Sequence, residues 1–170
     1  MGYIHNTSMR FIIPPSFAAG SGGTWVHTLD GTNWYLGRTA GAGNFYLGIP
    51  IVVPHQNASE NRGSRIASVD VYYQIYTAAM TTLTPEFNLQ AWELGGEGFA
   101  TPTNPAYTAD TTHSSNEGRV TTGVHFMNLE LNTPLWLEGD TSLRLDLYGV
   151  VDANSVFRFW GAQVNYTLRI

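Results

Sequence analysis

The chain has 170 residues with no lysine and no cysteine, so its strongly basic side chains are eight arginines. Without lysine there can be no phosphate-cradling P-loop lysine and no Schiff base, and without cysteine no disulfide, thiol nucleophile or cysteine-ligated metal. The net charge of −5 and the absence of a basic run argue against a nucleic-acid surface, and no stretch approaches the about 20 apolar residues of a membrane span.

A low content of charge is the second property of the composition. Charged residues make up 12% of the chain, whereas about 25% is usual. Neutral polar residues take their place, and an aromatic content of 13% indicates a folded chain rather than a disordered one. Surface charge helps to keep monomers soluble. We therefore expect much of this surface to be covered by other copies or to face an exterior environment.

Alternation of apolar and polar residues with a period of two dominates the chain and predicts strands rather than helices. The Asp30-Gly31 pair between two alternating runs predicts a β-hairpin. Pro50 limits its own segment to a sheet edge or a break. In chain order, we expect strands over residues 9–13, 25–29, 34–36, 45–53, 68–76, 87–94, 124–131, 143–147 and 156–170.

The last of these segments shows the longest alternation. Its even positions from Val156 to Ile170 are mostly apolar and include Trp160, so we expect this face to lie on the core. Gly161 has no side chain to pack and is expected to mark a bend or bulge. Trp25 and Trp136 are also expected in the core.

About eight strands without a helix long enough to cross between them predict an all-β protein, an antiparallel β-sandwich. A jelly roll is the favoured topology and an immunoglobulin-like sandwich the alternative, because the latter commonly carries cysteines that this chain lacks. We expect a single domain over residues 1–170 with a long polar loop at 95–118. Loops of that length are usually functional or interfacial.

Motifs for nucleophilic catalysis are weak. Ser21 within Ala19–Gly23 matches a nucleophile elbow only superficially, because neither a preceding strand nor a following helix is expected there. Asp110, His113 and Ser114 share one loop, whereas a catalytic triad is assembled across a fold. A polar loop with an Asx turn is the simpler interpretation. We expect no catalytic residue.

Metal and cofactor motifs are equally weak. The five histidines show no metal-binding spacing. His125 is expected to be a half-buried residue with its hydrogen bonds satisfied. Asp140 or Asp152 could contribute to a calcium site, but neither stands in the dense acidic pattern of a calcium loop. We expect no metal and no cofactor.

Aromatic side chains are the remaining candidates for a binding site. Tyrosine and tryptophan combine apolar area with a polar group and can stack on sugar rings, and they are also enriched in protein–protein interfaces. Both interpretations stay open. The candidate glycan or interface contacts are Trp34, Tyr35, Tyr72, Tyr76 and Trp92.

Two blocks near the end of the chain resemble the closing hairpin of viral and phage jelly-roll structural proteins. They are Pro134-Leu-Trp-Leu-Glu-Gly-Asp-Thr-Ser-Leu-Arg-Leu-Asp-Leu147 and Phe157-Arg-Phe-Trp-Gly-Ala-Gln-Val-Asn-Tyr-Thr-Leu168. The resemblance implies a virion component, such as a capsid-decorating protein, a minor capsid protein or a fibre head, commonly a trimer. Carbohydrate-binding jelly rolls look similar at the same level.

The expected function is therefore a non-enzymatic structural or assembly protein of a virion or extracellular appendage. Its expected partners are copies of itself, with a trimer favoured, and other virion or surface proteins, without nucleic acid or membrane. It is expected on a virion or extracellular surface without a cleavable signal peptide, since the N-terminus lacks a charged region followed by an apolar run. The alternative is a carbohydrate-binding or receptor-binding jelly-roll module.

Overall fold

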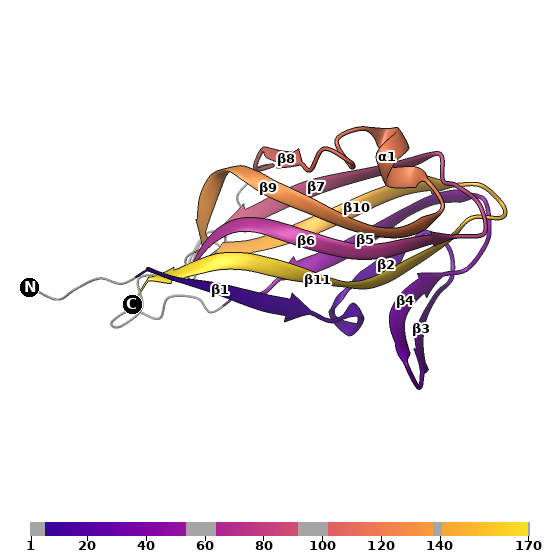
Figure 1. The fold of residues 1–170 in the computed structure, drawn as a ribbon, viewed down its shortest axis with the longest axis horizontal. Helices are drawn as coiled ribbons and strands as arrows, with labels where there is room; N and C mark the ends of the chain where they lie inside the picture. Colours follow the sequence, from indigo (N-terminus) through magenta and orange to yellow (C-terminus); the bar gives the residue numbers. More distant parts are fainter. Residues whose placement is uncertain (1–5, 54–63, 92–101, 138–140, 170) are drawn as a thin grey trace, which may run out of the picture.

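The computed structural model describes residues 6–53, 64–91, 102–137 and 141–169, which form two antiparallel sheets packed face to face (Figure 1). No helix in these ranges is both long enough and apolar enough to cross a membrane. The elements are β1 (Asn6–Ile13), η1 (Pro15–Phe17), β2 (Ala19–Ser21), β3 (Trp25–Asp30), β4 (Asn33–Arg38), β5 (Gly43–Ile51), β6 (Ser64–Tyr76), β7 (Thr82–Ala91), β8 (Tyr107–Ala109), α1 (Asn116–Val120), β9 (Gly123–Leu137), β10 (Thr141–Val151) and β11 (Val156–Arg169).

The strand order is that of a jelly roll. The larger sheet runs β3-β4-β11-β6-β9-β8, with β1 also paired to β11, and the smaller sheet runs β2-β5-β10-β7. From β5 to β11, successive long strands alternate between the two sheets, and the first strand pairs with the last. An immunoglobulin sandwich instead keeps three pairs of consecutive strands, A–B, D–E and F–G, each within one sheet. The predicted β-sandwich is confirmed.

The core lies between the sheets and is built from the inward residues of each alternating strand. These side chains are almost completely buried, which puts the apolar phase of β5, β6 and β10 on the inside. The inward residues of these three strands are Phe45, Leu47, Ile49, Ile66, Val69, Val71, Tyr73, Ile75, Leu143, Leu145 and Leu147.

The expectation that the even positions of the last strand face the core is wrong for the first half of β11. Pairing of β11 with β6 shifts by one residue between Phe159 and Gly161, so the alternation changes phase at this bulge. Before it, Phe157 and Phe159 point into the core, and Trp160 lies half-buried on the outer face. Gly161 has φ +134°, and a Cβ there would stand 2.9 Å from the carbonyl oxygen of Ile13. Glycine is thus required at the bulge.

Further expectations from the sequence concern the Asp30-Gly31 hairpin, two tryptophans and the long polar loop. The Asp30-Gly31 hairpin is confirmed as β3–β4, with Gly31 and Thr32 as the two loop residues. Trp136 is exposed rather than buried, while Trp25 is partly buried against Phe45. The expected polar loop at 95–118 contains β8 and the start of α1 in its described part, from residue 102 onward.

Arg38 holds two loops together from a buried position on β4. Its side chain is only 3% exposed. Nε donates to the carbonyl of Gly22 at 2.9 Å, and Nη1 donates to the carbonyls of Gly41 at 2.8 Å and Thr39 at 3.3 Å. The guanidinium carbon lies 5.7 Å from the ring centroid of Phe45. Arg38 thereby fixes the loops on both sides of the β3–β4 hairpin. Burial lowers the pKa of its guanidinium.

Replacing Arg38 by methionine should lower the free energy of unfolding by about 2 kcal/mol, because the carbonyl acceptors lose a charged donor. Arg38→Lys should recover less than half of that loss, since one ammonium cannot reproduce the planar fork of donors. Urea titration checks both values. Full rescue by lysine would show that only the charge matters at this position.

Candidate functional site

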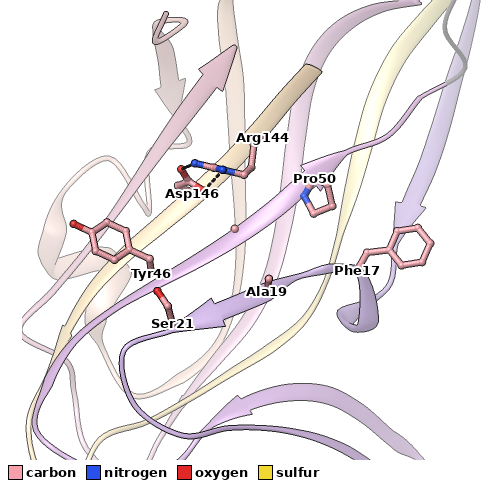
Figure 2. Close-up of a pocket in the computed structure, with 8 residues that line it drawn as sticks. Phe17, Ala19, Ser21, Tyr46, Pro50, Arg144 and Asp146 are labelled. Carbon is pink, nitrogen blue, oxygen red and sulfur yellow. Dashed lines mark hydrogen bonds and ion pairs between the residues drawn. The ribbon is translucent and has the colours of Figure 1, made fainter. Parts of the chain in front are cut away.

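A groove crosses the outer face of the smaller sheet. It consists of two hollows of about 460 and 200 Å³ that share Pro50 and Arg144. Figure 2 shows the larger hollow between the end of η1, β2 and the outward residues of β5 and β10. The larger hollow is lined by Phe17, Ala19, Ser21, Tyr46, Gly48, Pro50, Arg144 and Asp146, and the smaller adds Asn88, Gln90, Pro102, Ser142 and Leu143.

Three polar side chains at the centre of the groove form a fixed cluster. Arg144 donates from Nε to Asp146 Oδ1 and from Nη2 to Asp146 Oδ2, both at 2.7 Å. Asn88 on the neighbouring strand β7 donates from Nδ2 to Asp146 Oδ2 at 2.7 Å. The hydrogen bonds to Asp146 raise the pKa of Arg144, which stays charged. Such bidentate pairs hold their geometry. Asn88 Oδ1 and Arg144 Nη1 have no hydrogen-bond partner among the described residues and could bond to a ligand.

Two tyrosines flank this cluster on paired strands. Tyr46 on β5 and Tyr148 on β10 are register partners, and their ring centroids lie 4.9 Å apart. Tyr46 is 56% exposed. Beside them, Gly48 pairs with Asp146. A Cβ at Gly48 would lie 3.4 Å from Arg144 Cδ and from Asp146 Oδ1, so the missing side chain contributes to the hollow.

The charge of this outer face suits a ligand without charge. Its charged residues in the described ranges are Arg144, Asp146 and Glu86. Asp146 pairs with Arg144, and Glu86 on β7 stands in register with Asp146. Glu86 accepts a hydrogen bond from Asn104. A face with one excess negative charge and many hydrogen-bonding groups favours hydroxyl-bearing ligands over anions.

The aromatic residues singled out in the sequence do not line this groove. Tyr35, Tyr72 and Tyr76 lie on the outer face of the larger sheet, and Trp34 pairs with Leu29 in the β3–β4 hairpin. Trp92 lies outside the described residues. The sequence interpretation missed Tyr46, although both it and Tyr148 occupy outward positions in alternating strands. Only the pairing of β5 with β10, which sequence does not reveal, brings them together.

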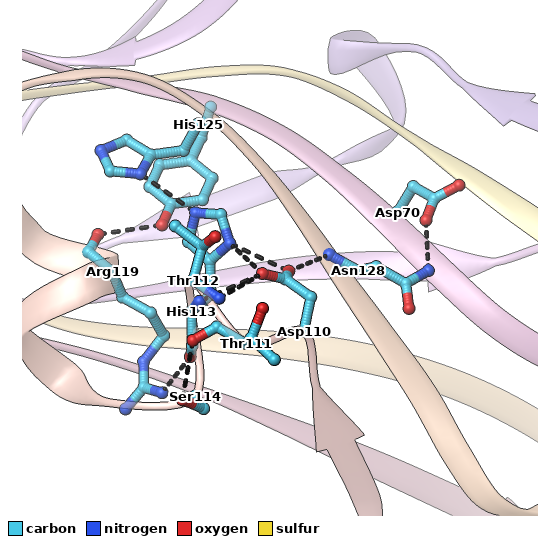
Figure 3. Close-up of polar contacts among 10 residues, drawn as sticks. Asp70, Asp110, Thr111, Thr112, His113, Ser114, Arg119, His125 and Asn128 are labelled. Atoms are coloured by element: carbon cyan, nitrogen blue, oxygen red, sulfur yellow. Dashed lines mark hydrogen bonds and ion pairs between the residues drawn. The ribbon is translucent and has the colours of Figure 1, made fainter.

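Asp110, His113 and His125 form a second polar cluster, at the junction of β8, α1 and β9 (Figure 3). Asp110 Oδ1 accepts from the backbone N–H groups of Thr112 and His113, which is the expected Asx turn. His113 Nδ1 lies 2.9 Å from both Asp110 oxygens, and His113 Nε2 lies 3.2 Å from His125 Nδ1. The expectation that the hydrogen bonds of His125 are satisfied is confirmed, and it is buried rather than half-buried.

The partners of this cluster determine where its hydrogens lie. His125 Nε2 faces the carbonyl of Thr121 at 2.8 Å and must donate to it. Burial raises the pKa of Asp110, but hydrogen bonds from Asn128 and His113 outweigh it and lower that pKa overall, so the carboxylate accepts from His113 Nδ1. His125 Nδ1 faces His113 Nε2. Burial lowers the pKa of His125, the Thr121 carbonyl partly opposes this, and His113 adds to the lowering.

This second cluster lacks a nucleophile among the described residues. Ser114 Oγ donates to the carbonyl of Thr111 rather than to His113. In the described ranges, no group of three or more histidine, aspartate or glutamate side chains is arranged to hold a metal ion. Asp140 lies outside those ranges, and Asp152 accepts a long hydrogen bond from Thr81. The hydrogen bonds of the cluster join the segment between β8 and α1 to β9.

Comparisons with known proteins identify likenesses of fold only. No protein-family model and no curated protein matches the chain. One similar solved structure comes from a study of promiscuous specificity in carbohydrate-binding modules of the β-sandwich superfamily, with 12% identity, a TM-score of 0.39, and coverage of 96% of this chain and 56% of that one. The chain thus spans little more than half the length of that structure.

Two further solved structures show weak similarity to the chain. The Agl-KA catalytic domain has 12% identity and a TM-score of 0.39, with 92% of this chain and 27% of that one covered. The family 32 carbohydrate-binding module of C. perfringens NanJ, in complex with galactose, has 11% identity and a TM-score of 0.29, with 92% and 99% covered. All three TM-scores lie below 0.5, so these likenesses assign no function to this chain.

Proposed function

We propose that this chain is a non-catalytic β-sandwich that binds uncharged glycans in the groove of the smaller sheet. The observation that carries the proposal is the placement of the Tyr46–Tyr148 pair beside the fixed Arg144–Asp146–Asn88 cluster. Binding sites for small molecules combine apolar or aromatic walls with a few well-placed polar groups. Here the ring of Tyr46, supported by Tyr148, supplies the wall, and the cluster supplies oriented donors and acceptors.

The geometry of the groove supports a ligand longer than one sugar ring. The two hollows meet at Pro50 and Arg144 and cross β5, β10 and β7 in succession. Neighbouring strands lie about 4.8 Å apart, so a ligand in both hollows spans several strands. Arg144, Asp146 and Asn88 are held by hydrogen bonds to one another, and this reduces the ordering cost of binding.

Replacing Tyr46 by alanine should weaken binding of a glycan ligand at least about tenfold, equal to about 1.4 kcal/mol. A broad glycan array identifies the ligand, and isothermal titration calorimetry measures its affinity. Gly48→Val should also abolish binding, because β-branched valine suits a strand but fills the hollow. The matched control is Tyr72→Ala on the other sheet, which should bind normally.

Two outcomes would overturn the proposed groove. The first is the absence of any ligand on a broad array. The second is a loss of binding in Tyr72→Ala with retention in Tyr46→Ala, which would move the site to the outer face of the larger sheet. That face carries the tyrosines that the sequence singled out.

A second candidate function is the structural role in a virion or extracellular appendage. The observation that favours it is the exposed apolar surface on the larger sheet, which includes Ile12, Val124 and Phe126. Exposed apolar patches of this kind mark interaction surfaces. Electron micrographs of the concentrated protein should then show ordered shells or fibres, whereas small separate particles would contradict this role.

A further inference from the structure

The outer face of the larger sheet has the composition of a protein interface. Val124 is 77% exposed, Ile12 70% and Phe126 52%, and the ring centroids of Tyr72 and Phe126 lie 5.0 Å apart. Interface cores are enriched in aromatic residues and arginine and depleted of lysine, glutamate and aspartate. Exposure of these apolar side chains to water is unfavourable, so we expect another protein surface to cover them.

Arg158 is held in a fixed position at one end of this face. Its guanidinium carbon lies 4.8 Å from the ring centroid of Tyr35 and 4.4 Å from that of Tyr76. Nη1 donates to Gln74 Oε1 at 3.3 Å. No described carboxylate lies within ion-pair distance of it. This cation is therefore preorganised for a carboxylate that the described part of its own chain does not provide.

The middle of the face contains an acid that needs no partner. Asp70 is nearly buried and accepts hydrogen bonds from the side-chain amides of Asn128 at 2.5 Å, Gln163 at 3.1 Å and Asn165 at 2.9 Å. These amides give both carboxylate oxygens hydrogen-bond donors within the sheet. Covering this part of the face would therefore leave neither oxygen without a donor.

Glu130 lies at the opposite end of the same face. Arg158 on β11 stands in register with Gln74 and, across β6, with Val124 on β9. Glu130 on β9 stands in register with Ser68 and, across β6, with Asn165 on β11. It is exposed and makes no ion pair with any described residue. Arg158 and Glu130 thus occupy diagonally opposite corners, with the Tyr72–Phe126 pair between them. A second cation, the exposed Arg10 on β1, stands in register with Asn165 at the Glu130 end of the face.

We propose that this face binds the same face of a second copy of the chain, across a two-fold axis. In such an isologous contact, if one residue meets another across the axis, the reverse contact forms as well. The axis would lie in the plane of the interface and run perpendicular to the line from Arg158 to Glu130. It then places Arg158 of each copy opposite Glu130 of the other. The Tyr72–Phe126 pairs then pack near the axis, and charge complementarity selects a second copy as the partner.

Charge exchange tests this pairing in the full chain. Analytical ultracentrifugation should give a dimer for the wild type at micromolar concentration. Arg158→Glu and Glu130→Arg should each raise the dissociation constant at least tenfold, because like charges then face each other. The double variant, Arg158→Glu with Glu130→Arg, should return to within about threefold of the wild type, since both ion pairs form again in reverse.

Two control variants separate the proposal from general effects of substitution. Glu117→Arg reverses a charge on α1, away from this face, and should leave the dimer unchanged. Phe126→Ser should dissociate the dimer while preserving the thermal unfolding of the monomer, because Phe126 is already exposed there. A wild-type monomer, a trimer as the resemblance to virion proteins implies, or a double variant as weak as the single ones would each overturn the proposal.

Discussion

Replacing Phe157 by alanine is expected to lower the free energy of unfolding by about 3–5 kcal/mol, the usual cost of emptying a large aromatic site in a core. The side chain is fully buried. Its ring centroid lies 5.1 Å from that of Phe45, 5.6 Å from that of Tyr73 and 6.4 Å from that of Trp25. These rings come from both sheets, so the cavity would open where the two layers meet and could not collapse easily.

Trp160 provides the matched comparison on the same strand. If the phase of β11 changes at Gly161, Trp160→Ala removes a half-buried ring that packs on Tyr35 at 5.2 Å, outside the core. It should cost about 1 kcal/mol, close to the centre of the range for single substitutions. Urea titration of both variants measures the difference. A larger loss for Trp160→Ala than for Phe157→Ala would contradict the phase change and restore the face that simple alternation predicts.

Period-two patterning predicts most of this fold because each strand has one face on a single shared core. The strands β5, β6, β7, β9, β10 and β11 are recognisable in this way, as is the β3–β4 hairpin through its Asp30-Gly31 turn, whereas β8 lies in the segment expected to be a loop. Patterning places Trp160 in the core by mistake. One extra residue at the bulge makes the side chains before it and after it follow opposite alternations. The shift occurs where the carbonyl oxygen of Ile13, far away in the sequence, comes close to Gly161.

The candidate groove could not be predicted from the sequence either, because it also depends on how the strands pair. Arg144, Asp146 and Tyr148 belong to the polar phase of one strand, and polar residues in such positions are usually only solvated. Their significance depends on Tyr46 and Asn88, which two different neighbouring strands supply. Strand pairing over such separations is set by the packed sandwich and not by local sequence.

The two outer faces differ in a way that supports separate roles. On the smaller sheet, Arg144 is already paired, and the polar groups line a groove. On the larger sheet, Arg158 and Glu130 are unpaired among the described residues, and apolar side chains lie between them. If both proposals hold, a dimer would present its two glycan grooves outward, and bivalent attachment would strengthen binding to a repetitive surface.

Acidification is expected to destabilise the fold in two separate pH ranges. Burial lowers the pKa of His125, the Thr121 carbonyl partly opposes this, and the charge of His113 adds to it. In the unfolded chain the pKa of histidine is about 6.5. Below that pH the unfolded chain takes up a proton that folded His125 resists, so stability falls as pH decreases. For one proton the slope cannot exceed about 1.4 kcal/mol per pH unit.

Asp110 contributes to a lower range. Its folded pKa is lowered by hydrogen bonds from Asn128 and His113 despite burial, and an unfolded aspartate has a pKa of about 3.9. The stability that Asp110 contributes is therefore present above that pH and is lost as the pH falls further. The other groups facing the pair are Tyr73, whose pKa burial raises, and Arg119, which donates to the carbonyl of His113.

Urea titrations at several pH values distinguish the two contributions. His125→Gln should flatten the decline between pH 6.5 and 5, because glutamine does not titrate, and should keep the decline below pH 4. The variant will be less stable at pH 7, since His125 stacks on Tyr73 with ring centroids 4.6 Å apart. The slope with pH is therefore the decisive quantity. A wild type that gains stability between pH 6.5 and 5, or a variant with the same slope, would show that folded His125 accepts the proton readily and that the cluster is not the buried network described.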